Sequence, residues 1–162
     1  MLYPHRGMTI TEPITTLTDY LLSISGATFA VLTLRLRGSH RALALWVLAF
    51  TCAAIAALAG GTFHGFKDYF NAATAKNMWD TAMIFVGATA AFLISASIVS
   101  SLRDEKWPHV RWLKRGLTIS VVGFAFQKIG WDPFSWFNHN DVYHLIQIAG
   151  FWCLYQGIKQ LR

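Results

Sequence analysis

The sequence carries little charge. Only 14% of its 162 residues are Asp, Glu, Lys or Arg, whereas a soluble domain carries roughly 25%. Too few polar side chains remain to cover a soluble surface, because 54% of the residues are apolar. The composition excludes a disordered chain, which requires low hydrophobicity. It also argues against a nucleic-acid-binding domain, although Lys and Arg outnumber Asp and Glu by fourteen to eight. We therefore expect a membrane protein.

Cysteine is scarce as well. The only two, Cys52 and Cys153, both lie inside apolar runs. No Cys-x-x-Cys or Cys/His finger spacing occurs, which excludes a structural zinc site of the finger type. We interpret both cysteines as small buried apolar side chains.

The sequence does contain five long apolar runs. A spanning helix needs about 20 mostly apolar residues, and the runs are continuous rather than alternating, which favours helices over a barrel. We expect one integral membrane domain over residues 1–162, an all-α bundle of five transmembrane helices. The fourth run is the weakest, because Gln127 and Lys128 fall in its last turn. The expected spans cover about residues 16–34, 42–63, 79–102, 112–129 and 142–158. The second and third are rich in Ala and Gly, which predicts that both lie in the bundle interior.

Basic residues alternate with the expected spans. Most of the fourteen Lys and Arg residues follow the first, third and fifth runs. By the positive-inside rule, the N-terminus lies outside and the C-terminus is cytoplasmic. The acids show the opposite bias, since only Asp104 and Glu105 fall on the cytoplasmic side. His5, His40 and His109 lie in tails or basic loops, and we expect them to be solvated.

Histidines and acids gather at the outer ends of the spans. Ionisable residues at membrane depth are costly unless they are paired or bound to a metal. Imidazole and carboxylate groups bind Zn²⁺, and three protein ligands leave a position for a reactive water. We predict that His64, His139 and His144 bind zinc and that Asp80 orients the water or acts as general base. Possible supporting residues are Asp19, Thr62, Asn140 and Asp141.

Simpler interpretations of these residues exist. Asp80 could be an acid favoured at a helix N-terminus, and Asp19 an interfacial residue. His139 and His144, five apart, share a helix face poorly, unless His139 precedes the helix. Asp141 and His144, three apart, share a face and could form a ligand pair or a carboxylate–histidine support.

The same residues resemble the CREST superfamily of membrane hydrolases, which comprises alkaline ceramidases, the adiponectin-receptor group and Per1-type lipid remodellers. Phe63-His64 looks like its first signature, Asp80 with Met83 like the ceramidase Asp–Met pattern, and His144 like its final histidine. Residues 15–22 and 60–66 are similar to a short bacterial branch of that group. The resemblance covers about half the chain and implies a zinc-dependent hydrolase in the bacterial inner membrane.

Two hypotheses follow. The first is a zinc-dependent hydrolase that cleaves an amide or ester of a lipid at the outer membrane face. The second is a non-catalytic membrane subunit of a larger complex, with a degenerate site or a structural metal or cofactor. It rests on Gly60, which stands at the serine position of the resemblance, and on Asn140, four residues before His144. Both imply the lipid bilayer as a partner, the first a lipid substrate and the second other membrane proteins, but no nucleic acid.

Overall fold

The structure is a computed structural model that describes residues 9–36, 42–101 and 107–161. Five α-helices and one short 3₁₀ helix account for nearly all of these residues, which confirms the all-α prediction. Their bounds are α1 Pro13–Leu34, α2 Ala42–Phe66, η1 Lys67–Tyr69, α3 Ala72–Ser101, α4 Trp107–Ile129 and α5 His139–Ile158. The helices begin and end within a few residues of the expected runs, except that α3 starts seven residues and α4 five residues before the expected positions.

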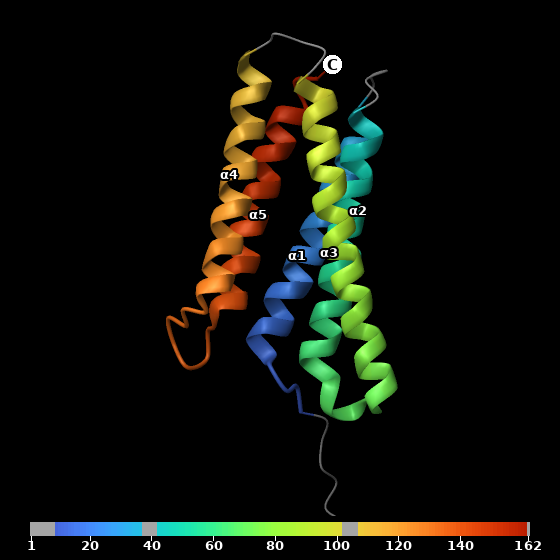
Figure 1. The fold of residues 1–162 in the computed structure, drawn as a ribbon, viewed down its shortest axis with the longest axis vertical. Helices are drawn as coiled ribbons and strands as arrows, with labels where there is room; N and C mark the ends of the chain where they lie inside the picture. The colour runs from blue at the N-terminus through green and yellow to red at the C-terminus, as the bar shows by residue number, and fades with distance from the viewer. Residues whose placement is uncertain (1–8, 37–41, 102–106, 162) are drawn as a thin grey trace, which may run out of the picture.

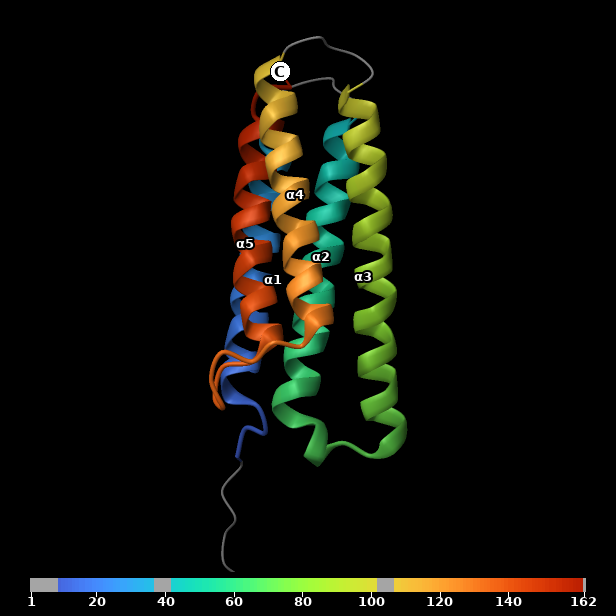
Figure 2. The same ribbon diagram turned by 60° about the vertical axis from the view of Figure 1, so that its left-hand side comes forward.

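The five helices lie side by side along one long axis (Figures 1 and 2). Helix α4 packs on α5, α5 on α1, α1 on α2, and α2 on α3. The main neighbours therefore follow the order α4–α5–α1–α2–α3, with α3 and α4 at the two edges, and the row is bent so that α2 and α5 also touch. This order brings the first and last helices of the chain into contact.

Three helices are long and apolar enough to cross a membrane: α1, α2 together with η1, and α3. These candidate spans indicate an integral membrane protein. Helix α2 lies in the interior as expected, since 50% of its most apolar stretch is buried. The matching prediction for α3 is wrong, because only 11% of its stretch is buried. Helix α3 packs mainly on α2, so its small residues largely face outward.

The interior of the row is held by aromatic and close helix contacts. Phe50 of α2 meets Phe151 of α5 with ring centroids 5.3 Å apart, and Trp46 packs beside Phe50. Helices α4 and α5 approach so closely that a Cβ atom on Gly116 would lie 2.6 Å from Cγ of Leu154. Glycine is therefore needed at this crossing, because only a residue without a side chain lets the two helices approach so closely.

The two ends of the bundle differ in character. We call the end with η1, the start of α1 and the 130–138 loop the site end, and the opposite end the basic end (Figure 1). Described basic residues at the basic end are Arg35, Arg111, Lys114, Arg115 and Lys159. His109 is also there, but it belongs to α4 and is 1% exposed. The expectation that it is solvated is wrong, while His5 and His40 lie outside the described residues.

Candidate functional site

A buried polar cluster joins α1 and α5 at the site end. On α5, the helix start is fixed by a capping box, in which Asn138 accepts from backbone N–H groups and Asp141 accepts from the N–H of Asn138. This cap holds Asp141 and His144, one turn apart, against α1. On α1, Thr15, Thr18 and Asp19 face them and are buried.

Asp19 and His144 form a direct contact within this cluster. Oδ1 of Asp19 lies 3.1 Å from Nε2 of His144, and the two side chains are only 5% and 7% exposed. A buried polar group is costly unless it is hydrogen-bonded, and a buried charge unless it is also paired. The contact therefore gives Oδ1 of Asp19 and Nε2 of His144 a partner that neither helix could supply alone.

The partners of Thr18 fix the protonation of the histidine. Its Oγ1 lies 3.1 Å from both the Thr15 carbonyl and Oδ1 of Asp141, and 3.0 Å from Nδ1 of His144. A hydroxyl has a single hydrogen, and the two oxygens can only accept. The Thr18 hydroxyl therefore shares its one hydrogen between these two oxygens in a bifurcated hydrogen bond. It accepts a hydrogen bond from Nδ1–H of His144. Consequently the Asp19–His144 contact contains one shared proton, located on either Nε2 or Oδ1.

The second carboxylate oxygen of Asp19 differs from the first in its hydrogen bonding. Oδ2 is buried and has no hydrogen-bond partner among the described residues. A Cβ atom on Gly60 would lie 3.4 Å from Oδ1 and 3.5 Å from Oδ2, and one on Gly61 would lie 2.8 Å from Cβ of Asp19. The glycine pair of α2 thus lets the helix approach Asp19 closely, and neither glycine places a side chain against the carboxylate.

His64 lies near the same end but has its own partner. Nδ1 of His64 is 2.9 Å from Oε2 of Glu12, and the ammonium of Lys67 contacts Oε1 of the same carboxylate. Burial raises the pKa of Glu12, but the hydrogen bond from Lys67 and the charge of His64 outweigh it and hold this pKa below its ordinary value. This cluster joins the segment before α1 to the end of α2.

His139 is placed on the other side of α5. It is the first residue of that helix, and Nδ1 lies 2.7 Å from Oδ1 of Asp132 in the preceding loop. The hydrogen bonds from His139 lower the pKa of Asp132 below its usual range. Both side chains are partly or largely open to the surroundings.

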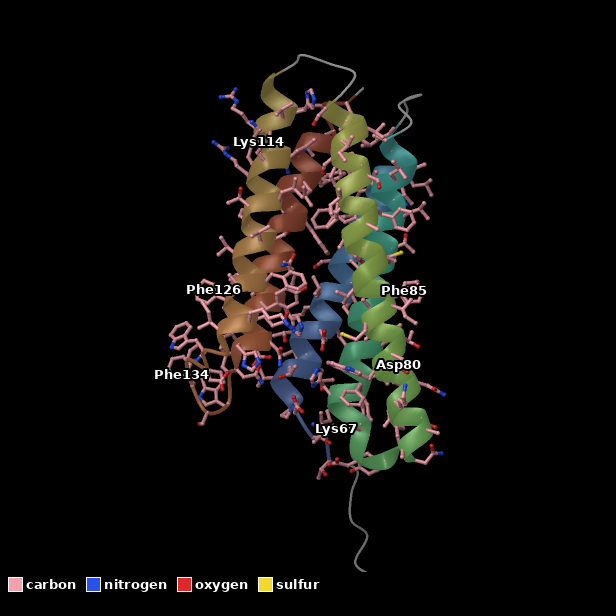
Figure 3. The ribbon with its side chains drawn as sticks, viewed as in Figure 1. Lys67, Asp80, Phe85, Lys114, Phe126 and Phe134 are labelled. Atoms are coloured by element: carbon pink, nitrogen blue, oxygen red, sulfur yellow. The ribbon has the colours of Figure 1, made fainter. Side chains whose placement is uncertain are left out.

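The other predicted residues are dispersed. Asp80 lies on α3 (Figure 3), partly exposed, and its carboxylate pairs with Lys76 one turn earlier. Thr62 donates to the Leu58 carbonyl and lies 3.3 Å from the hydroxyl of Tyr20. Asn140 accepts from Gln127 of α4.

The structure therefore brings together only part of the predicted site. Asp19, Asp141 and His144 share one cluster, whereas His64 and His139 each pair with a different carboxylate. Across residues 9–36, 42–101 and 107–161, no three His, Cys, Asp or Glu side chains are placed to hold one metal ion. The geometry as it stands does not fit a three-ligand zinc site, and zinc stays a prediction.

Sequence reasoning missed Thr15, Thr18 and Glu12. A usable signal was present, because Thr15 and Thr18 on α1 and Asp141 and His144 on α5 are polar pairs three residues apart at the same end of otherwise apolar helices. Such pairs lie on one helix face. Recognising that these faces meet required the neighbour order of the helices.

Comparison with known proteins gives a family but no activity. The profile of a family of unknown function (DUF6962) matches residues 14–110 and 101–162, which together cover most of the chain. No curated protein and no solved structure matches it.

Proposed function

This chain belongs to the family of unknown function DUF6962, and we propose that it is a five-span membrane hydrolase that uses Asp19 and His144 as an acid–base pair on a lipid amide or ester. The observation that carries the proposal is the buried 3.1 Å contact between them, with Oδ2 of Asp19 left without a hydrogen-bond partner among the described residues. General acid–base catalysis needs a positioned group that can take and return a proton. Oδ2 of Asp19 is the atom that can take a proton, and the proton shared with His144 is one that the pair can also return.

Five spans are supported by the arrangement of α4 and α5. They run alongside the three candidate spans and contain 23 and 20 residues, against 22 in α1. The polar residues that make α5 less apolar, including Asp141, His144 and Gln147, are buried. With five spans, the basic end is cytoplasmic and the site end faces outward, as the positive-inside rule requires. A bacterial inner membrane is the corresponding location.

The proposed reaction uses the chain's own groups. Because Oδ2 of Asp19 is buried, the proposed reaction requires the helices to open far enough to admit water and the substrate carbonyl. With His144 as imidazolium, the Asp19 carboxylate then accepts a proton from a water molecule at Oδ2, and the resulting hydroxide forms the new bond to the substrate carbonyl carbon. The tetrahedral intermediate then breaks its bond to the amine or alkoxide, which takes the proton from Asp19. The products are a carboxylic acid and an amine or alcohol. His144 stabilises the carboxylate and remains held by Thr18 throughout.

Hydrolysis of fluorogenic lipid amides and esters by the purified chain tests this proposal. We expect turnover by the wild type and a loss of about 100-fold or more in both Asp19→Asn and His144→Gln. The matched control is Asp68→Asn, which removes an exposed carboxylate at the same end. No turnover by the wild type, or equal turnover by Asp19→Asn, contradicts the proposal. Zinc analysis of the wild type and His64→Ala tests the cofactor separately.

One feature favours the second hypothesis, a subunit of a larger membrane complex. The outward face of α3 has apolar and small residues at alternating spacings of three and four, a pattern typical of helix–helix contacts. These residues are Ile84, Gly87, Ala91, Ile94 and Ile98, and all are exposed. Purification from the native membrane distinguishes the hypotheses, since a partner at fixed stoichiometry together with an inactive chain favours the subunit.

A further inference from the structure

A basic and aromatic surface covers the outer side of α4 and α5 at the basic end. The guanidinium of Arg115 lies 5.1 Å from the ring centroid of Trp112, and that ring meets Trp152 of α5 edge-on at 5.6 Å. Trp152 is 49% exposed. With Arg111 and Lys114, which are also exposed, these residues form what we call the basic–aromatic face.

The three cations of this face lie on one side of the helix. Arg111, Lys114 and Arg115 are related by spacings of three and four. Leu113 and Gly116, on the other side, are buried against α5. Lys114 points away from the bundle in Figure 3. The surface is therefore outward and positively charged.

Protein groups in the described part of the chain leave this charge uncompensated. None of the ion pairs formed there involves Arg111, Lys114 or Arg115. Helix α4 also has no acid in its first turn. The positive end of the helix dipole adds to the same field. Negative charge, which the described acids do not supply, would complement this surface.

The position of the cations in α4 suggests the source of that charge. In the five-span arrangement, the uncharged residues 116–126 between Arg115 and Gln127 extend only about 16 Å at 1.5 Å per residue, which is less than the roughly 30 Å hydrocarbon core of a bilayer. The cations therefore lie at or below the level of the lipid headgroups, where long basic side chains extend toward the interface. The exposed indole ring of Trp152 also favours this level.

We propose that the basic–aromatic face binds an anionic phospholipid of the cytoplasmic leaflet, with the phosphate on Arg111, Lys114 and Arg115 and an acyl chain along Trp112 and Trp152. This inference rests on the five-span arrangement but not on hydrolysis. A soluble phosphate would use only the cations, whereas the partly buried ring of Trp112 and the exposed ring of Trp152 match the glycerol and acyl regions of a lipid. Basic pockets between spanning helices bind anionic headgroups by this chemistry.

Quenching of tryptophan fluorescence tests the proposal. The full chain is placed in phosphatidylcholine nanodiscs that contain either brominated phosphatidylglycerol or brominated phosphatidylcholine. We expect stronger quenching by the anionic lipid in the wild type. Lys114→Gln/Arg115→Gln should weaken its apparent affinity about tenfold or more. The matched control, Lys76→Gln/Lys128→Gln, removes two exposed cations from the site end and should retain the wild-type affinity.

Three results would overturn the proposal. They are equal quenching by the two lipids in the wild type, equal losses in the two double variants, and displacement of the quenching lipid by soluble glycerol phosphate. The last result would assign the cations to a small anion. Asp19→Asn separates this proposal from hydrolysis, because it should lose turnover and keep the preference for phosphatidylglycerol.

Discussion

Oδ1 of Asp19 lies 3.1 Å from Nε2 of His144, and this contact joins the first helix of the chain to the last. Both side chains are more than nine-tenths buried, so water cannot replace either partner without opening the bundle. Removing one partner leaves the other with a buried, unsatisfied polar atom. The contact should therefore matter for stability as well as for chemistry.

A double-mutant cycle on Asp19→Ala and His144→Ala should show strong coupling. Each single variant removes the hydrogen bond between the two side chains, so the second substitution costs less than the first. We expect a coupling energy of at least about 1 kcal/mol, within the range for contacting residues. Unfolding in mixed detergent micelles measures it. The exposed pair Asp132 and His139 provides the control and should show no measurable coupling. Additive losses of unfolding free energy in the Asp19 and His144 variants would contradict a direct hydrogen bond between the two side chains.

Gly61 should be far less tolerant of alanine than Gly87. A Cβ atom on Gly61 would lie 2.8 Å from Cβ of Asp19 and 3.0 Å from the Tyr20 ring, so α1 and α2 must separate. Overpacking of this kind costs about 1–3 kcal/mol. Gly87, also mid-helix, has nothing within 4 Å of the corresponding position. Thermal unfolding in detergent compares the variants, and equal effects of the two would disprove the close α1–α2 approach.

The positions of the helices along the chain were predictable, because the length of an apolar run can be read from neighbouring residues in the sequence. The neighbours of each helix in space were not predictable, since composition does not say which helix forms an edge. Helix α3 illustrates this, because its Gly and Ala residues predicted an interior position and the structure places it at an edge. His109 shows the same limit, as α4 begins earlier than its apolar run and buries it.

The sequence predicted that the candidate site residues lie at one membrane level, but it did not predict which of them pair with one another. Asp19, Asp141 and His144 were expected at the outer membrane face, and the structure brings them together. His64 was expected beside His144, yet its nearest acid is Glu12, which comes from the segment before α1. A residue outside the apolar runs gives no periodic signal, so only the folded arrangement shows this pair.

Acidification should reduce the contribution of Glu12 to stability. Its pKa lies below the ordinary 4.5 in the folded chain, because Lys67 and His64 outweigh the effect of burial. A carboxyl group whose pKa is lowered by folding stabilises the folded state at pH values above its ordinary pKa. This stabilisation is lost as the pH falls from 4.5 through the pKa of the folded state. Glu12→Gln should therefore destabilise the chain at neutral pH and have less effect in acid.

Unfolding free energies of the wild type and Glu12→Gln, measured from about pH 7 to about pH 3, check this dependence. In a Lys67→Gln background the same substitution should show a weaker pH dependence, because the hydrogen bond that lowers the pKa of Glu12 is absent. A Glu12→Gln effect that stays constant or grows on acidification would show that the carboxylate is not stabilised by this cluster.

Gly60→Ser should stabilise the fold and block the proposed chemistry at once. The serine Cβ would lie 3.4 Å and 3.5 Å from the Asp19 oxygens, which is ordinary contact distance. Its hydroxyl can donate to the unpartnered Oδ2, and such a hydrogen bond to a carboxylate contributes about 1.5–3 kcal/mol. Gly60→Ala fills the same space without a donor and serves as the control. Serine should therefore exceed alanine in unfolding free energy while reducing lipid turnover, since Oδ2 is occupied. A serine variant no more stable than alanine would mean that Oδ2 already has a partner in the membrane.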